Sequence, residues 1–273
     1  MFSIVTVPED APDLTEQVGT KPKFWYKYSN SIKHLFKEAI PGTGEDWAEK
    51  VASELFALTG IPHVKYELAV WKNKRGVICP NFSPTGFRFV HGNELLARVM
   101  DAYPIKKFYG VKQYTLKRVL AIVGFPGLIK LPIGWEALPV RTPIEVFVGY
   151  LMMDAWISNQ DRHHENWGFI VTPESTIHLA PSYDHASCLG SHENDVNRSD
   201  RLTTGDRRRN MEQYVSKASS AFYASPSAEK PLSTVEAFIE AGRMKSGSAD
   251  TWLTQLERVV SLRDKSNLRA DSP

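Results

Sequence analysis

The segment from residue 142 to 157 constrains the fold of this 273-residue chain more than any other. It opens with Thr-Pro-Ile-Glu, a capping box between Thr142 and Glu145 with Pro143 at the first helical position. The residues that follow, through Ile157, are almost all apolar, so the predicted helix has no polar face. A helix of this kind is expected to be buried, and it would give rigid support to the polar loop that comes directly after it.

The spacing of apolar residues changes near residue 82. Before it, alternating patterns predict strands, interrupted by a helix over 44–59 that Thr43 is placed to cap and Gly60 to end. A turn is expected at 73–76. After a stretch rich in Gly, Pro and Phe, the spacing becomes helical. The expected strands are 23–28, 32–38, 64–71, 77–82 and 176–179, and the further helices are 93–102, 112–123 and about 250–263.

This order of elements predicts an α+β protein with two lobes. We expect a small β-rich lobe over 1–82, a connection over 83–92, and a larger, mainly helical lobe over 93–273. With 42% apolar residues, the chain is long enough to bury a sizeable core in such a body.

Composition excludes several classes of protein. The net charge of +2 argues against nucleic acid as a direct partner, although the arginine-rich stretch 198–209 could form a local basic patch or a solvated loop. The two cysteines, Cys79 and Cys188, lie far apart, which fits reduced thiols in a cytoplasmic protein. No basic and then apolar leader opens the sequence. Its longest apolar run, 119–129, has about half the ~20 residues of a membrane-spanning helix, so no membrane partner is expected.

The loop after the apolar helix carries residues suited to phosphoryl transfer. Asp161 and Asn166 stand five positions apart, as in the H-R-D-x-x-x-x-N loop of protein kinases. There the aspartate accepts or orients the proton of the attacking hydroxyl, and the asparagine binds magnesium. Asp184 follows 18 residues later, after the short strand at 176–179, where a second carboxylate can bind Mg²⁺. The sequence therefore predicts Asp161 as a catalytic residue, and Asn166 and Asp184 as metal ligands.

The β-rich lobe is expected to supply a cation and a partner acid. Lys37 shares a strand face with Leu35 and is the candidate for binding the α- and β-phosphates, with Lys27 as the competing choice. Glu49 lies near the edge of the apolar stripe of the helix over 44–59, so it could pair with Lys37. Glu45 and Glu54 are the alternatives.

Two further sites complete the predicted machinery. Gly19, Thr20 and Lys21 precede the first clear strand and could close over phosphates through backbone N–H groups. His163 is expected to brace the catalytic loop by hydrogen bonding. Adjacent histidines, such as His163 and His164, point in different directions, which argues against a zinc site.

Three stretches together resemble the HipA-like serine/threonine kinases of bacterial toxin–antitoxin systems. They are N-x-D-R-H-x-x-N at 159–166, L-A-P-S-Y-D at 179–184 and S-C-L-G at 187–190. The stretch EDWAEKVASELFALTGIP at 45–62 is similar to the helix that those proteins place beneath the nucleotide. The likeness extends from about Gly19 to Tyr214.

The resemblance implies a two-lobed, protein-kinase-like fold that uses ATP and Mg²⁺ and phosphorylates a hydroxyl of a protein substrate. It implies the same roles for Asp161, Asn166, Asp184 and Lys37, and it aligns His163 with the loop histidine of the family. Longer HipA proteins begin with a subdomain that has no counterpart here. An antitoxin, a small accessory partner or a compact form that works alone all remain open.

Two other functions are also compatible with these residues. Phosphatidylinositol kinases also use a D-R-H-x-x-N loop, so a lipid or small-molecule kinase is the alternative among enzymes. The alternative outside enzymes is a nucleotide-binding scaffold that has kept the fold and lost turnover.

Overall fold

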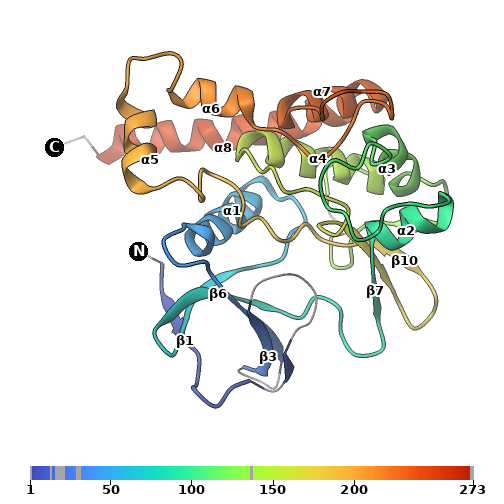
Figure 1. Cartoon of the computed structure of the whole chain (residues 1–273), viewed down its shortest axis with the longest axis horizontal. Helices are drawn as coiled ribbons and strands as arrows, with labels where there is room; N and C mark the ends of the chain where they lie inside the picture. Colours follow the sequence, from blue (N-terminus) through green and yellow to red (C-terminus); the bar gives the residue numbers. More distant parts are fainter. Residues whose placement is uncertain (1, 13, 16–21, 29–31, 136–137, 271–273) are drawn as a thin grey trace.

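The computed structural model describes every residue except 1, 13, 16–21, 29–31, 136–137 and 271–273. A β-sheet lobe lies at one end and a helical region at the other, which confirms the predicted α+β class (Figure 1). The strands are β1 Ile4–Thr6, β2 Leu14–Thr15, β3 Lys23–Lys27, β4 Lys33–Glu38, β5 Glu67–Trp71, β6 Lys74–Pro80, β7 Arg88–His91, β8 Ile129–Lys130, β9 Gly168–Val171 and β10 Ile177–Leu179. The helices are α1 Glu45–Thr59, α2 Gly92–Val99, α3 Leu116–Val123, α4 Pro143–Trp156, α5 Asp195–Thr203, α6 Met211–Lys217, α7 Thr234–Met244 and α8 Ser248–Ala270.

The first sheet has six strands in the order β1-β5-β6-β4-β3-β2. Its pairs are antiparallel except for β1 with β5. Because side chains alternate along a strand, β4 sends Phe36 into an aromatic cluster on one face and Leu35 toward the other. Lys37 shares the face of Leu35, which is the face that meets α1. Strand alternation thus directs one lysine of β4 toward the interior.

The hairpin between β5 and β6 turns earlier than predicted. Trp71 pairs with Lys74, and the two residues between them, Lys72 and Asn73, have φ angles of 46° and 64°. Two left-handed residues form the type I′ turn that matches the twist of a hairpin. The expected turn at 73–76 was therefore wrong. Gly76 lies within β6, where a Cβ would stand 2.3 Å from the carbonyl oxygen of Lys37 on the neighbouring strand.

Helix α1 also begins differently from the prediction. Gly44, and not Thr43, is its N-cap residue, and the hydroxyl of Thr43 donates to the carbonyl of Ile40 at 2.7 Å. A glycine is needed here because a Cβ on residue 44 would meet the ring of Trp47 at 2.2 Å. The predicted end is confirmed: Gly60 adopts the left-handed conformation of a C-cap.

A second sheet, with strand order β7-β9-β10-β8, supports the loops of the helical lobe. Strand β7 falls within the stretch 83–92 that was predicted as a connection, and it pairs with β9 from Val90 to Phe169 and from His91 to Gly168. This pairing brings the start of α2 against the loop that follows α4. Strand β10 coincides closely with the strand predicted over 176–179.

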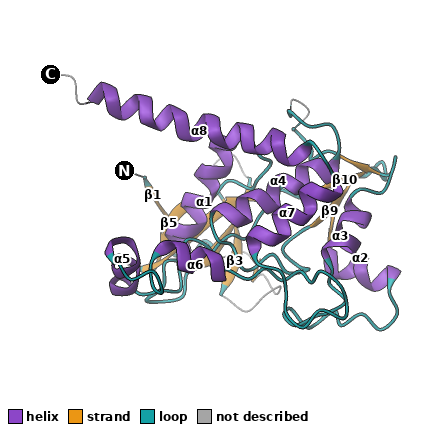
Figure 2. Cartoon of the chain, turned by 90° about the horizontal axis from the view of Figure 1, so that it is seen from above, coloured by secondary structure: helices purple, strands orange, loops and turns teal. Residues whose placement is uncertain are grey.

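Helix α4 runs through the centre of the helical lobe and is buried along nearly its whole length, as its composition predicts. The carboxylate of Glu145 accepts the backbone N–H groups of Arg141 and Thr142, both at 2.9 Å. Gly149 lies against the ring of Trp252 from α8, where a Cβ would come within 2.7 Å. Figure 2 shows α8 passing along the molecule beside α4 and α7. It is longer than the helix predicted over 250–263, and α2 and α3 are shorter than predicted.

The arginine-rich stretch 198–209 is helical up to Thr203, and its second half, with Arg208 and Arg209, is an exposed turn. Arg198 pairs with Asp195 and lies over the ring of Trp47 at 5.3 Å, and Arg201 pairs with Glu193 at 2.6 Å. Arg208 and Arg209 both pair with Asp206. These acids neutralise much of the basic patch. Within the described part of the chain, no helix combines the length and apolar character required to cross a membrane.

Candidate active site

Lys37, Glu49 and Asp184 meet where the sheet, helix α1 and the segment after β10 come together. Lys37 Nζ lies 3.1 Å from Glu49 Oε2 and also pairs with Asp184 Oδ1. The side chain of Glu49 is fully buried, and its other oxygen accepts the backbone N–H of His185 at 2.6 Å. Asp184 has a φ of 58°, a left-handed value that few residues other than glycine adopt. Such backbone conformations gather at functional sites.

Charge and burial oppose each other in this cluster. Burial alone would lower the pKa of Lys37, but the carboxylates of Asp184 and Glu49 raise it, so the lysine stays charged. Burial raises the pKa of Glu49, against the charge of Lys37. The three groups depend on one another, since each buried charge has its partner within the cluster. The alternatives lie elsewhere: Lys27 is exposed on β3, and Glu54 pairs with Lys50.

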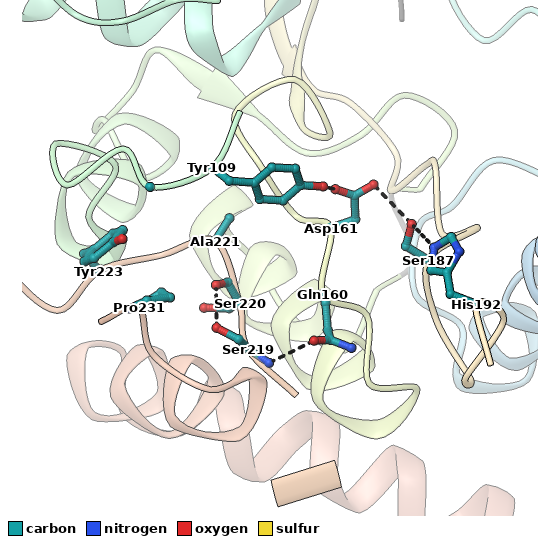
Figure 3. A pocket seen from close by; sticks show the side chains of 11 residues that line it. Tyr109, Gln160, Asp161, Ser187, His192, Ser219, Ser220, Ala221, Tyr223 and Pro231 are labelled. Atoms are coloured by element: carbon teal, nitrogen blue, oxygen red, sulfur yellow. Dashed lines mark hydrogen bonds between the residues drawn. The ribbon is translucent and has the colours of Figure 1, made fainter. Parts of the chain in front are cut away.

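Asp161 lies in the loop after α4, with hydroxyl groups on both of its carboxylate oxygens (Figure 3). Tyr109 donates to Oδ1, and Ser187 donates to Oδ2 at 3.3 Å. Ser187 follows Asp184 by three residues, so the same segment serves both carboxylates. The charges of both acids also raise the pKa of Tyr109, after burial and the bond to Asp161.

Asn166 is positioned by its own loop. Its Nδ2 donates to the carbonyl of Asp161 at 2.6 Å, which turns the amide oxygen to the opposite side. Among the described residues, no group of three or more His, Cys, Asp or Glu side chains could hold a metal ion. The amide oxygen of Asn166 and the carboxylate of Asp184 are both hard ligands of the type that Mg²⁺ prefers, and a bound ion would take further oxygens from phosphate and water. These donor types suit magnesium and not zinc.

A buried ion pair supports the catalytic loop from below. Both oxygens of Asp154, in α4, accept from the guanidinium of Arg162 at 2.7 Å, and both side chains are almost inaccessible. Arg162 also donates to the carbonyl of Asn166 at 3.0 Å, and Asn159 donates to Asp154 at 2.8 Å. The sequence prediction missed Asp154. Its signal was one aspartate in an otherwise apolar helix, eight residues before an arginine.

The adjacent histidines have different partners. His163 Nδ1 accepts the backbone N–H of Glu165 at 3.1 Å, which leaves the Nε2 proton facing Asp161 Oδ1 at 3.6 Å. His163 thus makes a hydrogen bond within its own loop. His164 is fully buried, and its Nδ1 lies 2.7 Å from the hydroxyl of Tyr103.

The burial of His164 makes stability depend on pH. Burial lowers the pKa of its ring from 6.5 to about 4. As the pH falls from 6.5 toward 4, the unfolded chain binds a proton at this ring and the folded chain does not. We expect His164 alone to lower the free energy of unfolding by about 3 kcal/mol across this window. Urea unfolding at several pH values would measure it. His164→Asn keeps an acceptor for Tyr103, and in this variant the free energy of unfolding should depend less on pH between 6.5 and 4. An unchanged pH dependence would show that His164 is not the group responsible.

The predicted phosphate loop, Gly19, Thr20 and Lys21, lies outside the described residues. The sequence prediction also missed the wall of an open cavity of about 360 Å³ beside Asp161 (Figure 3). Its lining comes from four separate stretches of the helical lobe and includes Tyr109, Gln160, His192, Ser219, Ser220 and Tyr223. Apart from Gln160, which lies within the motif at 159–166, these residues carry no sequence motif, because only the fold brings them together.

Comparisons with known proteins agree on the fold. No protein-family model and no curated protein matches the sequence. Among solved structures, the Helicobacter pylori proinflammatory kinase CtkA matches with a TM-score of 0.62 and 19% identity, over 92% of this chain and 79% of that chain. The toxin–antitoxin complex of HipA, HipB and operator DNA from Shewanella oneidensis MR-1 gives a TM-score of 0.53 and 12% identity. That match covers 91% of this chain but 56% of the other, so this chain spans little more than half of it.

The two matches confirm the resemblance seen in the sequence at the level of the fold. They also agree with the two-lobed order of elements, in which a sheet of six strands precedes a mainly helical region. The protein has a HipA-like kinase fold.

Proposed function

We propose that the protein is an ATP- and Mg²⁺-dependent serine/threonine protein kinase of HipA-like type. The observation that carries this proposal is the cluster of Lys37, Glu49 and Asp184, with Asp161 on a supported loop close by. Kinases need a lysine–glutamate pair and a metal-binding aspartate in place at the same time. In this chain, three elements distant in sequence supply them.

Each residue has a role in this proposal. Glu49 holds Lys37, whose ammonium group binds the α- and β-phosphates, and the backbone of Gly19, Thr20 and Lys21 covers the phosphates. Asp184 and Asn166 hold magnesium, which when bound neutralises charge on the phosphates. Asp161 orients the acceptor hydroxyl and takes its proton, and His163 holds the loop in shape.

The acceptor is proposed to be a protein hydroxyl. The cavity beside Asp161 is open to solvent and lined by hydroxyl and amide groups from the helical lobe, which suits a side chain presented by another protein. None of the residues that line it is a lysine or arginine, so an acidic acceptor has no cation there to meet it. The Shewanella structure contains HipB, and an antitoxin or small accessory partner for this chain remains a proposal of the same kind.

Lys37→Met should weaken the binding of Mg-ATP by about 10- to 100-fold, because a charge-assisted hydrogen bond contributes about 1.5–3 kcal/mol. Methionine preserves the packing of the side-chain stem and removes only the ammonium group. Titration calorimetry with Mg-ATP would measure the change. Lys27→Met, on the exposed end of β3, is the matched control and should bind as the parent does. Equal losses of Mg-ATP affinity in the two variants would show that Lys37 does not bind the phosphates.

Incubation with labelled ATP distinguishes the proposed kinase from the alternatives. We expect magnesium-dependent labelling of proteins in a cell extract and none of inositol lipid vesicles. Labelling of the lipids alone would favour a lipid kinase. Binding of Mg-ATP without any ATP consumption would favour a scaffold that has lost turnover. A phosphoproteomic comparison of cells that express the parent or Asp161→Asn would then identify the substrate.

A further inference from the structure

Tyr109 occupies the position at Asp161 where an acceptor hydroxyl is expected. Its phenolic O–H donates to Asp161 Oδ1, and Figure 3 shows the ring pointing along the wall of the cavity to this carboxylate. In the proposed kinase, an acceptor hydroxyl makes the same contact before it attacks, because the base orients it and takes its proton. The chain therefore supplies one of its own hydroxyls to its base.

The loop that carries Tyr109 is anchored to the catalytic loop on both sides. Tyr103 lies 2.7 Å from His164 through its hydroxyl, and Tyr114 donates to the carbonyl of Arg162 at 3.0 Å. The ring of Phe108 lies 4.9 Å from that of His163. Tyr109 itself is 56% exposed, and its ring packs edge-on against that of His163, with 5.8 Å between the centroids. Its position is thus set by the anchored loop, by this ring contact and by the hydrogen bond.

Ser187 is the competing hydroxyl at the same carboxylate. It donates to Asp161 Oδ2 at 3.3 Å, and His192 Nε2 lies 3.2 Å from its oxygen. Its neighbours, Ala186 and Cys188, are buried, so its backbone is held in the core. The side chain of Tyr109 is exposed, so it can rotate away from Asp161 once it is modified, without movement of the anchored loop. This difference favours Tyr109 as the internal acceptor.

We infer that Tyr109 is a modification site, and that the protein transfers phosphate onto it within the same molecule. This inference rests on the proposed kinase function. The phenolic oxygen of Tyr109 forms a bond to the γ-phosphorus of ATP, and the bond from that phosphorus to the β,γ-bridging oxygen breaks. ADP leaves with the electron pair, and the phenolic proton passes to Asp161 Oδ1.

Modification would also free the base. The hydrogen bond to Asp161 holds only while Tyr109 has a proton to donate, and burial together with that bond raises the pKa of this phenol. A phosphate on the same oxygen has no such proton and carries about two negative charges at neutral pH. Repulsion from Asp161 would then drive the side chain out of the acceptor position. A protein hydroxyl could enter from the cavity in its place.

The test is to incubate the purified full chain with Mg-ATP and map phosphate by peptide mass spectrometry. We expect phosphate on Tyr109 in the parent and in Tyr28→Phe, which removes another partly exposed tyrosine on the β-sheet lobe. Asp161→Asn should incorporate at least about 100-fold less phosphate on Tyr109 than the parent. In Tyr109→Phe, the phosphate should not move to the buried Tyr103 or Tyr114. The half-time of phosphate incorporation should not change when the protein is diluted, because the transfer is intramolecular.

Three other results of this experiment would contradict the inference. Phosphate on Ser187 with Tyr109 unmodified, in a protein that labels an extract, would reject Tyr109 and leave the kinase function standing. A rate that rises with protein concentration would reject transfer within one molecule. Absence of transfer to any acceptor would remove the kinase function and the inference together.

A measurement without nucleotide tests the contact itself. With isotope-labelled tyrosine, the NMR signal of Tyr109, assigned from its loss in Tyr109→Phe, should shift in Asp161→Asn. The signal of Tyr28 should not move. An unchanged Tyr109 signal would show that the two side chains do not meet in solution, and the inference would fail whatever the activity.

Discussion

Asp161→Asn is expected to lower the rate of phosphate transfer by about 10²- to 10⁴-fold, the range that a positioned general base contributes. The amide has the size of the carboxylate, so Ser187 can still donate to its single oxygen. The amide cannot take the proton of an acceptor, and it lacks the charge that orients the hydroxyl. Initial rates with labelled ATP at saturating acceptor would measure the loss.

The fold should not change in this variant. Asp161 is partly exposed and has no buried charge as its partner, so the free energy of unfolding should stay within about 0.5 kcal/mol of the parent value. Asp195→Asn is the control, since Asp195 is an exposed acid on α5 and distant from the described cluster. Near-normal transfer by Asp161→Asn would falsify the role assigned to this residue.

Asp154→Asn is expected to have the largest effect on stability, a loss of about 3–5 kcal/mol in the free energy of unfolding. The substitution preserves volume and removes only the charge. Arg162 then remains buried with its guanidinium uncompensated, and it cannot lose its proton because its pKa is already far above neutrality. Urea denaturation of parent and variant would measure the difference in midpoint and slope.

The matched control breaks an exposed pair of the same kind. Arg208 and Asp206 pair near the surface, where water screens the charges, so Asp206→Asn should change the free energy of unfolding far less than Asp154→Asn does. In Asp154→Asn, activity should also fall, because Arg162 holds the carbonyl of Asn166. Equal stability losses in the two variants would mean that the ion pair beneath the catalytic loop contributes no more than one at the surface.

Local signals in the sequence predict much of the fold. The alternation of β3 and β4, the capping box of α4 and the stop at Gly60 all depend on neighbours within a few residues, and each is found in the structure. The predictions that were wrong concern residues whose conformation is set by neighbours distant in the sequence. Gly76 looks like a turn residue, but it is a glycine because the carbonyl of Lys37 approaches it across the sheet. Strand β7 was missed because its partner, β9, lies about 80 residues away along the chain.

Some residues of the candidate site could likewise be predicted from the sequence, and others could not. Asp161, Asn166 and Asp184 could be selected because phosphoryl transfer fixes their spacing and order. Strand alternation indicated Lys37 through its shared face with Leu35, but Lys27 lies on that same face, opposite Lys33, and only its exposed place at the end of β3 sets it apart. Asp154 has only a weak local signal, a single charge in an apolar helix eight residues before Arg162, and Tyr109 has none, because it comes from a surface loop more than 50 residues before Asp161. Only coordinates bring these side chains to the site.

Helix α1 belongs to both lobes at once. The side of it that carries Glu49 to the sheet also places Ala52 and Phe56, one and two turns later, in the same apolar core as α4 and α8. The segment after it hydrogen-bonds to Ser182, two residues before Asp184, through Val64 at 2.8 Å and Pro62 at 3.0 Å. A polypeptide cut after residue 82 would keep the ion pair of Glu49 with Lys37 but would expose the apolar side of α1 to water. We therefore expect the two lobes to unfold together.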